Sequence, residues 1–501
     1  MTNKNLLLII GLILLQFSSV SQTKKDINGN NYFIQGNLNR TAAEWEPAQG
    51  TMVVWPLSVP YKLVVELSKD NHLYTLVAND STKFEAQKWY DQWGINSNNN
   101  TFIYAPQGMD AWWTRDWGPS AVFTNGGKMK LGDGKYIYST PVTKISCNDS
   151  LKFLYVGKNN EIIKTEIDDN ATVPLAKGLN LEVLDLPYIN TGGNVLTDGL
   201  GTAFSTCIVL NENRFYNVNQ EKFLSLNKEL LGFEQYNFIS NFEKIGIQHI
   251  DCFMKLLDEE RILVAEPPTD HELYPIYENI IENELKKLKT AYGRPYEILR
   301  IKTNRYDGER LAAYTNSIII NKTIYVPLFQ IKADSIALQI WRDLMPGYAV
   351  KGFTFALIDE PIVSKEMKEH YKSGYGWNSG DALHCRTRAI WDNEMLFITT
   401  KRLNKIVPST QQKIVYTTII DYSNKGLVKD KCQIFWRVLG ESNWSISQLS
   451  LDVNQNQFFY EIPYSKKGTT VEYFISAESK SGRKETKPRT APLGTYQFMI
   501  E

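Results

Sequence analysis

Three separated features of the sequence carry side chains that could act on a planar cation: an aspartate among tryptophans, a histidine–aspartate pair, and a cysteine in a basic setting. The aspartate is Asp116, in the segment from Met109 to Pro119, which also holds three tryptophans. A carboxylate accepts two parallel N–H bonds from a guanidinium, and aromatic rings stack on such a cation or face it. The segment is equally compatible with an aromatic core and a surface ion pair between Arg115 and Asp116.

His249 and Asp251 stand two residues apart, just before an apolar run that predicts a strand. On an extended segment the two side chains face the same side, so the pair could serve as a proton shuttle and a cation clamp. The alternatives are a histidine beside a surface aspartate, and a metal site. We predict no metal, because no second histidine or cysteine stands at ligand spacing around the pair.

Cys385 lies between His384 and Arg386, a polar and basic setting that favours the reactive thiolate. On an extended segment, the ring of its neighbour His384 is expected to point away from the sulfur and not to act as the base. The chain has five cysteines at wide spacing, which does not predict a disulfide framework. We expect the other four to be buried structural thiols, with Cys252 facing the core because it alternates with Asp251.

Two further features are weaker chemical signals. Gly193 and Asn194 follow Gly192 in a loop between predicted strands, and the loop lacks the GxGxxG spacing of a nucleotide site. A backbone that approaches a ligand and a plain tight turn both fit this loop. Asn316 precedes an apolar strand, where it could donate to a reacting centre or simply end a turn.

The elements that must position these residues fall into two parts. Strand and helix signals alternate up to roughly residue 405, which predicts an α/β domain. From about residue 413, strand-like runs alternate with turn signals and no helical periodicity appears. Roughly 90 residues of this kind fit a small β-sandwich of the immunoglobulin or fibronectin type. Without a suitable cysteine pair, we exclude a disulfide-bridged immunoglobulin domain.

Composition and the N-terminus suggest where the protein acts. Lysine plus arginine equals aspartate plus glutamate, 55 each, so no global charge favours nucleic acid or an anionic membrane. Lys4 and the apolar run Leu6 to Phe17 predict a secretory signal peptide over residues 1–21. The run is too short to span a membrane comfortably. We therefore expect a secreted or otherwise extracytoplasmic protein with no integral membrane segment after signal cleavage.

Taken together and in this order, these features resemble the agmatine deiminase and Porphyromonas-type peptidylarginine deiminase family, within the guanidino-group-modifying superfamily. The matching elements are Trp45-Glu46-Pro47 before Trp55-Pro56, Thr114-Arg115-Asp116, Gly192-Gly193-Asn194 with Asp198-Gly199, His249-x-Asp251, Tyr314-x-Asn316 and His384-Cys385. The resemblance implies a pentein catalytic domain over residues 43–405, an α/β propeller of five ββαβ blades. An immunoglobulin-like β-sandwich, residues 413–501, resembles the accessory domain of the secreted members.

The resemblance also implies a role for each site residue. Cys385 would attack the guanidinium carbon, while Asp116 and Asp251 hold the guanidinium N–H groups. His249 would protonate the departing ammonia and then activate water against a covalent thiouronium intermediate. Trp113 would wall the substrate stem, and Asn316 would be a polar group near the sulfur. Gly193 and Asn194 complete the implied substrate site, and no cofactor or metal is expected.

The expected activity is conversion of arginine side chains in peptides or proteins to citrulline. Thr191 stands where the family often has an acidic residue, which fits the peptidyl branch better than the free-amine branch. No arginine occurs between Arg115 and Arg214, so the carboxylate-binding arginines of members that prefer a C-terminal arginine are missing. The alternatives are a deiminase of small guanidines such as agmatine, an amidinotransferase, and a non-catalytic surface-binding protein.

Overall fold

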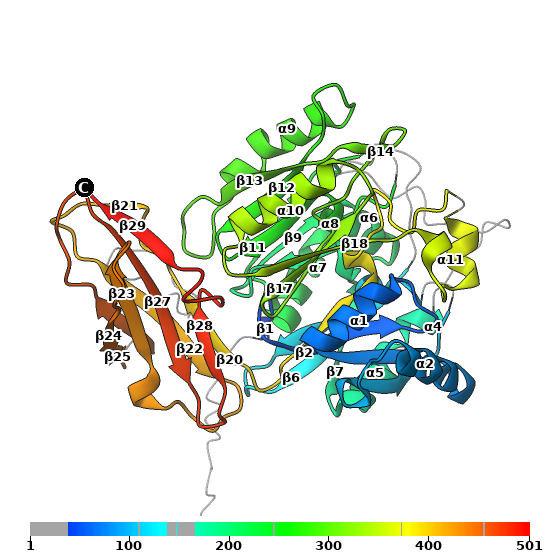
Figure 1. Ribbon diagram of the computed structural model, residues 1–501, viewed down its shortest axis with the longest axis horizontal. Helices are drawn as coiled ribbons and strands as arrows, with labels where there is room; N and C mark the ends of the chain where they lie inside the picture. Colours follow the sequence, from blue (N-terminus) through cyan, green and yellow to red (C-terminus); the bar gives the residue numbers. More distant parts are fainter. Residues whose placement is uncertain are drawn as a thin grey trace, which may run out of the picture.

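A computed structural model describes residues 39–108, 111–137, 147, 166–243, 246–371, 373–453 and 456–501. An α/β part and an all-β part lie side by side (Figure 1). The predicted signal peptide, residues 1–21, lies outside the described residues, as do Met109 and Asp110. No helix in the described part of the chain is both long and apolar enough to cross a membrane.

Five sheets of the α/β part share one plan, which the sheet around β17 illustrates. Strand β16 (Ile318–Ile320) pairs antiparallel with β17 (Thr323–Leu328), and helix α10 (Ala333–Leu344) then leads to β18 (Ala349–Thr354), which is parallel to β17. The strands are rich in β-branched residues, and β16 is completely buried. At the hairpin Asn321 adopts a φ of 52°, a left-handed conformation that asparagine tolerates.

The other four sheets repeat this order of two antiparallel strands, helix and parallel strand. They comprise β1 (Arg40–Thr41), β5 (Ser120–Phe123), β6 (Met129–Lys135) and β7 (Glu182–Ile189); β8 (Leu196–Thr197), β9 (Thr202–Thr206) and β10 (Gln235–Ile239); β11 (Met254–Asp258), β12 (Arg261–Glu266) and β13 (Glu297–Lys302); and β19 (Arg388–Trp391), β2 (Ala48–Val54), β3 (His72–Val77) and β4 (Asn100–Tyr104). Strands β1 and β4 are additional edge strands beside β5 and β3. In the last sheet, β19 from the end of the α/β part pairs with β2 from its beginning. The mixed α/β class is therefore confirmed, whereas the five-bladed propeller arrangement stays a prediction.

Helices cover the sheets. The helices include α1 (Tyr61–Asp70), α2 (Asp80–Gln92), α5 (Thr172–Leu179), α6 (Ile208–Phe215), α7 (Gln220–Leu226), α9 (Tyr274–Asn283) and α11 (Lys365–His370).

The apolar pattern of residues 202–210 predicts a single strand, but β9 ends at Thr206 and α6 begins at Ile208. Cys207 between them already has helical backbone angles, so a continuous apolar run did not distinguish a strand from a buried helix.

The all-β part consists of two sheets around a separate apolar core. One sheet has β20 (Leu396–Thr400), β22 (Ile414–Asp421), β26 (Gln457–Glu461) and β25 (Ser450–Asp452); the other has β21 (Ile406–Val407), β29 (Tyr496–Ile500), β27 (Thr470–Glu478), β23 (Gln433–Val438), β24 (Ser445–Gln448) and β28 (Lys484–Lys487). Because β20 pairs with β22, these sheets begin before the predicted boundary at residues 405–413. An immunoglobulin-like topology stays a prediction.

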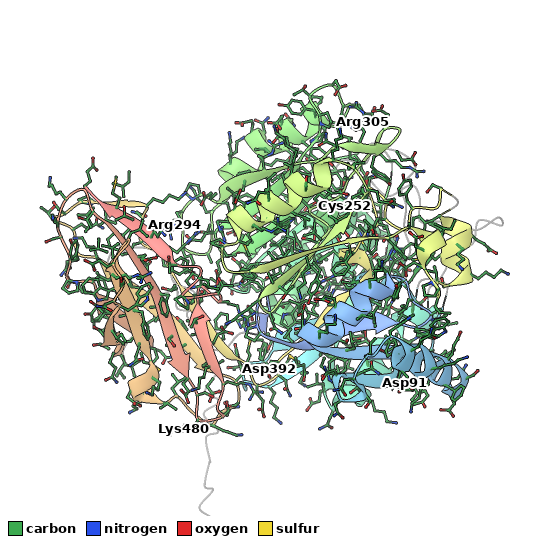
Figure 2. The ribbon with its side chains drawn as sticks, in the orientation of Figure 1. Asp91, Cys252, Arg294, Arg305, Asp392 and Lys480 are labelled. Atoms are coloured by element: carbon green, nitrogen blue, oxygen red, sulfur yellow. A yellow bond between two sulfur atoms is a disulfide. The ribbon has the colours of Figure 1, made fainter. Side chains whose placement is uncertain are left out.

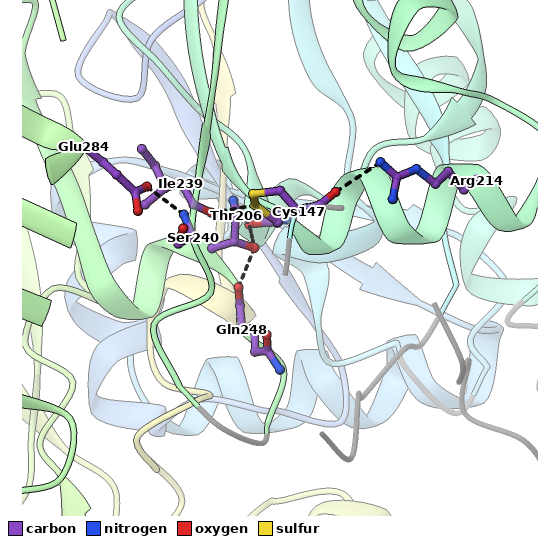
Figure 3. Close-up of a disulfide and its surroundings, with 9 residues drawn as sticks. Cys147, Thr206, Arg214, Ile239, Ser240, Gln248 and Glu284 are labelled. Atoms are coloured by element: carbon purple, nitrogen blue, oxygen red, sulfur yellow. Dashed lines mark hydrogen bonds between the residues drawn. A yellow bond between two sulfur atoms is a disulfide. The ribbon is translucent and has the colours of Figure 1, made fainter. Parts of the chain in front are cut away.

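The prediction that all but the reactive cysteine are structural thiols is wrong for one pair. Cys147 and Cys207 form a disulfide although 60 residues separate them in sequence (Figure 3). An odd cysteine count leaves at least one thiol unpaired but does not exclude a single bridge, and the fold brings these two together. Cys252, Cys385 and Cys432 are free and buried.

Candidate active site

Four single-turn elements bring the predicted site residues together. They are the helices α3 (Thr114–Trp117) and α8 (Ile250–Phe253) and the 3₁₀ turns η2 (Gly192–Asn194) and η6 (His384–Arg386). All four lead directly or within two residues into a strand, and each of these strands belongs to a different sheet. Turn η2 contacts both α3 and α8, and α3 also contacts η6. The site therefore lies where several sheets meet.

Gly193 lies at the centre of this arrangement. Its backbone N–H donates to Oδ1 of Asp116 at 3.0 Å. A Cβ atom on Gly193 would lie 2.4 Å from Asp116 Oδ1, 3.0 Å from His249 Nδ1 and 3.4 Å from Asp251 Oδ2. Three predicted site residues therefore surround one glycine, and the absence of a side chain there allows their close approach.

His249 and Asp251 do not lie on an extended segment as predicted. His249 immediately precedes α8, and Asp251 lies in the first turn of that helix. Both are almost fully buried, and His249 Nδ1 is 3.5 Å from Asp116 Oδ1. Burial lowers the pKa of His249, but the nearby carboxylates, chiefly Asp116 with Asp251 and Glu212, together outweigh it and raise this pKa to about 9. The imidazole is therefore protonated at neutral pH.

The sulfur of Cys385 faces the same carboxylates from η6. Its Sγ is 3.6 Å from Asp251 Oδ2 and accepts a hydrogen bond from Asn316 Nδ2 at 3.3 Å. A hydrogen bond from Cys252 lowers the pKa of Cys385, but burial and nearby carboxylates raise it to about 11. The thiol therefore keeps its proton at neutral pH.

Asn316 contacts Cys385 and its turn through both the nitrogen and the oxygen of its side-chain amide. Its Nδ2 contacts the sulfur of Cys385, and its Oδ1 accepts from the backbone N–H groups of His384 at 3.0 Å and Cys385 at 3.3 Å. The side chain is completely buried. Of the two roles that the sequence left open, the geometry favours a polar group beside the sulfur over a residue that only ends a turn.

His384 does not point away from the site as expected, because η6 is a helical turn and not a strand. Its Nδ1 is 2.7 Å from Asp251 Oδ2, and its Nε2 is 2.5 Å from Glu44 Oε2. Burial raises the pKa of Asp251, but the hydrogen bond from His384 and nearby positive charges lower it overall. His384 therefore helps to keep Asp251 ionised for a cationic ligand.

Glu44 and Lys255 extend this polar network, and the sequence reasoning passed over both. Lys255 Nζ is 2.6 Å from Glu44 Oε1, and Arg115 Nη2 is 3.6 Å from Glu44 Oε2. With Arg388 and His384 they line a cavity of about 40 Å³. Lys255 stands within an apolar run that predicts a buried strand, and this position was a usable signal of a charged partner. Lysines are almost never fully buried unless they are paired.

Two buried tryptophans, Trp112 and Trp113, directly precede the helix that carries Asp116. Trp113 directly precedes α3 and is 6% exposed. Its ring centroid is 5.0 Å from that of Trp112, and the ring of His370 lies edge-on to both. Buried aromatic rings next to the helix that carries Asp116 are suited to contact an alkyl stem.

Asn194 positions the backbone around the site by hydrogen bonds. Its Oδ1 accepts from the backbone N–H groups of Thr206 and Ile250, at 3.0 and 3.1 Å. Thr206 also donates through its hydroxyl group to the carbonyl oxygen of Gln248, next to the disulfide (Figure 3). Asn194 therefore holds η2 against β9 and the start of α8, and its Oδ1 is used for positioning.

Cys252 belongs to the site and not to the apolar core alone. It lies in the interior of the α/β part (Figure 2), with its Sγ 3.5 Å from Asp251 Oδ1. The expectation that Cys252 faces away from Asp251 assumed a strand, whereas both residues lie on α8. Together with Cys385, these residues offer three metal-ligand atoms within 4.8 Å of one another, although the sequence predicted no metal site.

Comparisons with known proteins agree with this arrangement. A protein of Yersinia pseudotuberculosis, whose name describes a candidate agmatine deiminase, is 26% identical over 272 residues, 48% of this chain and 68% of its own length. A Vibrio parahaemolyticus protein of the same name is 25% identical over 210 residues, 36% of this chain and 58% of its own length. This chain thus spans less than two thirds of that Vibrio relative.

Solved structures of agmatine deiminases share the fold of the α/β part. The C. jejuni enzyme is 20% identical, covers 72% of this chain and 98% of its own, and has a TM-score of 0.51. The Enterococcus faecalis enzyme is 18% identical, covers 71% of this chain and 96% of its own, and has a TM-score of 0.52.

The sequence pattern described as Porphyromonas-type peptidyl-arginine deiminase matches residues 40–359, well over half of the chain. The matched segment contains Asp116, Gly193, His249, Asp251 and Asn316, and it ends before Cys385. The resemblance predicted from the motifs is therefore confirmed, and the chain belongs to the Porphyromonas-type peptidyl-arginine deiminase family.

Proposed function

We propose that this protein hydrolyses the guanidino group of a small guanidine such as agmatine, releasing ammonia and leaving a ureido group. The observation that carries the proposal is the set of two buried carboxylates and an imidazole around Gly193, with the Cys385 thiol beside Asp251. The names of the curated relatives favour agmatine over the peptidyl arginine that the sequence led us to expect.

Substrate binding uses the two carboxylates. Asp116 and Asp251 each accept N–H bonds from the guanidinium, which holds its planar carbon in front of Cys385 Sγ. Both groups are at most 2% exposed, so few water molecules compete for them. Their charges also explain why the site selects a cation.

Binding of the cation prepares the nucleophile. Burial and the negative charges of Asp251 and Asp116 raise the pKa of the Cys385 thiol, and a bound guanidinium offsets those charges. The thiol then releases its proton to solvent more easily, since His249 is already protonated, and the sulfur attacks the guanidinium carbon to form a tetrahedral adduct. The Nδ2 group of Asn316 donates to the sulfur as its charge develops.

His249 supplies and removes the protons. In its protonated form it transfers a proton to one nitrogen of the adduct, the C–N bond breaks, ammonia leaves, and a thiouronium remains on Cys385. The neutral imidazole then accepts a proton from water, whose oxygen attacks the same carbon. Cleavage of the C–S bond releases the ureido product and regenerates the thiol.

The first test is substitution of the nucleophile. Cys385→Ala should reduce ammonia release to background while the variant keeps the wild-type circular dichroism spectrum. Cys432→Ala is the matched control, because it is another buried free thiol but lies in the all-β part. Full activity in Cys385→Ala would refute the mechanism.

A peptidyl arginine substrate is the second candidate. The family description names peptidyl-arginine, and the chain carries an all-β part beyond the matched residues. Agmatine, a peptide with an internal arginine and a peptide ending in arginine should be compared by ammonia release and by the mass shift of the product. Activity on a peptide but not on agmatine would favour this candidate over our proposal.

We also propose that the protein is exported. The N-terminal apolar run over residues 6–17 supports export, and so does the Cys147–Cys207 disulfide, because disulfides persist mainly in oxidising compartments. Fractionation of cells that express the full chain, followed by N-terminal sequencing, tests this proposal. A cytoplasmic protein that retains residues 1–21 would contradict it.

A further inference from the structure

Two thiols face the carboxylate of Asp251. The Sγ of Cys252 is 3.5 Å from Asp251 Oδ1, and the Sγ of Cys385 is 3.6 Å from Asp251 Oδ2. The Nδ2 group of Asn316 contacts both sulfurs, at 3.7 and 3.3 Å. The proposed deimination uses Cys385 and Asp251 but assigns no step to Cys252.

The spacing of these three groups suits a tetrahedral metal ion. Zinc bonds of about 2.3 Å to thiolate and about 2.0 Å to carboxylate oxygen place neighbouring sulfur and oxygen ligands about 3.5 Å apart. The two observed sulfur–oxygen distances, 3.5 and 3.6 Å, are close to this value but run to different oxygens of Asp251, so one sulfur must turn toward the oxygen that the other faces. One ligand atom from each of the three residues lies within 4.8 Å of the others, so small side-chain rotations complete the set.

The surroundings of the three groups also favour a bound cation. His384 Nδ1 is hydrogen-bonded to Asp251 Oδ2 at 2.7 Å, as an outer-shell partner of a ligating carboxylate would be. A second buried carboxylate borders the same space, because the Cβ position of Gly193 is 2.4 Å from Asp116 Oδ1 and 3.4 Å from Asp251 Oδ2.

We propose that Asp251, Cys252 and Cys385 form an inhibitory site for a thiophilic divalent cation such as Zn²⁺. Two sulfur ligands favour zinc, cobalt or cadmium over Mg²⁺ and Ca²⁺. Binding releases the two thiol protons to solvent and ties up the electron pair with which Cys385 attacks. The ion also occupies the region of the substrate cation. The inhibition rests on the proposed function, whereas the binding does not.

Cobalt titration of the reduced full-length protein tests the binding without an activity assay. Co²⁺ should produce thiolate-to-cobalt charge-transfer absorption that saturates at about one ion per chain, and Zn²⁺ but not Mg²⁺ should displace it. Cys252→Ser should weaken binding by at least about tenfold, because even outer-shell substitutions cost roughly 10- to 100-fold. Cys252→Ala serves as a second variant, and Cys432→Ser should bind like the wild type.

Inhibition is then measured separately as the ratio of rates with and without Zn²⁺ in each variant. The wild type and Cys432→Ser should be inhibited in competition with substrate, and both Cys252 variants should resist. No charge-transfer band in the wild type, or unchanged binding in both Cys252 variants, would overturn the proposal. Cobalt binding through Cys252 in a protein that deiminates no guanidine would uphold the metal site while refuting the proposed function.

Discussion

At the residue scale, the geometry of the site is sensitive to any side chain at Gly193. An alanine Cβ there would lie 2.4 Å from Asp116 Oδ1, so the carboxylate must move. Because a displacement of about 1 Å can cost 100-fold in rate, we expect Gly193→Ala to lower kcat/KM by about 100-fold or more. Steady-state ammonia release measures this effect.

Gly380→Ala provides the control for that substitution. Gly380 lies in the loop before Cys385, and a Cβ there would have its nearest neighbour at 3.7 Å, an ordinary contact. This variant should retain activity within a few-fold of the wild type. Equal losses in the two variants would mean that general loop perturbation, and not the position of Asp116, causes the effect.

The protonation states of His249 and Cys385 predict a pH profile. Burial lowers the pKa of His249, but the nearby carboxylates together raise it to about 9. A hydrogen bond from Cys252 lowers the pKa of Cys385, but burial and the carboxylates raise it to about 11, so both groups hold protons at neutral pH. The reactive state has one proton fewer, with an anionic sulfur and a protonated imidazole. The ratio kcat/KM, which reports the free enzyme, should therefore rise with pH up to about 9.

The profile of kcat should break at a lower pH than that of kcat/KM. The bound guanidinium offsets the charges of Asp116 and Asp251, which lowers both pKa values in the complex. Initial rates across a constant-ionic-strength buffer series provide both profiles. A kcat/KM that is flat from about pH 6 to about pH 9 would contradict the assigned protonation states.

The sequence predicted the reactive side chains of the site better than it predicted the residues that surround and position them. Asp116, His249, Asp251 and Cys385 were predicted from their types and motifs, and the structure brings them together. Cys252 was placed in the core, because its side-chain direction was derived from a strand that is a helical turn. A contact between residues more than 100 positions apart, such as Cys385 with Asp251, has no local sequence signal.

At the scale of elements, a buried ion pair anchors the turn that carries the nucleophile. Arg386 follows Cys385 and donates to both carboxylate oxygens of Asp381, at 2.9 and 2.6 Å. It also donates to the carbonyl oxygens of Gly376 and Ser58. The pair thus links η6 to the preceding loop and to the segment after β2.

Removing one partner of this pair should be costly. Asp381→Ala leaves the fully buried Arg386 without its counter-charge, and we expect a loss of about 3–5 kcal/mol in the free energy of unfolding of the α/β part. Urea denaturation followed by tryptophan fluorescence measures it. Asp307→Ala, which removes a partner of the exposed Arg310, should cost less than about 1 kcal/mol.

The double variant Asp381→Ala with Arg386→Met separates charge from packing. Replacing a buried ion pair by apolar side chains is often neutral or stabilising, so the double variant should be more stable than Asp381→Ala alone. If the double variant is less stable than the wild type by the sum of two independent losses, the Arg386 guanidinium contributes mainly through its other hydrogen bonds.

The sequence predicted the class of each part but not the order of the sheets. Alternating strands and helices indicated the α/β part correctly, because its longer helices, such as α1 and α10, have clear signals. The pairing of β19 with β2 joins segments more than 300 residues apart and cannot be read locally. The boundary was placed too late, because β20 follows β19 after a short loop with no change in composition.

At the scale of the whole molecule, the all-β part is fixed to the α/β part by buried polar contacts. Arg294 (Figure 2) reaches from the α/β part to the carbonyl oxygen of Arg402, at 2.8 Å. Arg489 donates to the carbonyl oxygen of Trp45 at 2.7 Å. Contacts of this kind couple the unfolding of the two parts, so the wild type should unfold in one main thermal transition.

The Lys487–Glu259 ion pair provides the sharpest test of this coupling. The two groups are 2.5 Å apart, and each side chain is at most 6% exposed. Burial raises the pKa of Glu259, and Lys487 counteracts this effect. Lys487→Met removes the counter-charge, so the pKa of Glu259 rises further and its ionised form becomes more costly in the folded state.

The loss of stability in Lys487→Met should therefore depend on pH. A carboxyl group with a raised folded-state pKa binds protons more tightly when folded, so it costs no stability below its unfolded pKa of about 4.3, and the cost grows as pH rises above that value. We expect a loss of about 3–5 kcal/mol at about pH 8 and a smaller loss at about pH 5. Thermal unfolding at the two pH values measures this difference.

Lys405→Met is the matched control, because Lys405 also links the two parts but is 80% exposed in its pair with Glu297. It should cost less than about 1 kcal/mol at either pH. Adding Glu259→Gln to Lys487→Met should remove the pH dependence, because the titrating group is gone. An equal loss at both pH values in Lys487→Met would assign the effect to lost packing of the lysine stem, and the charge coupling between the two parts would have to be abandoned.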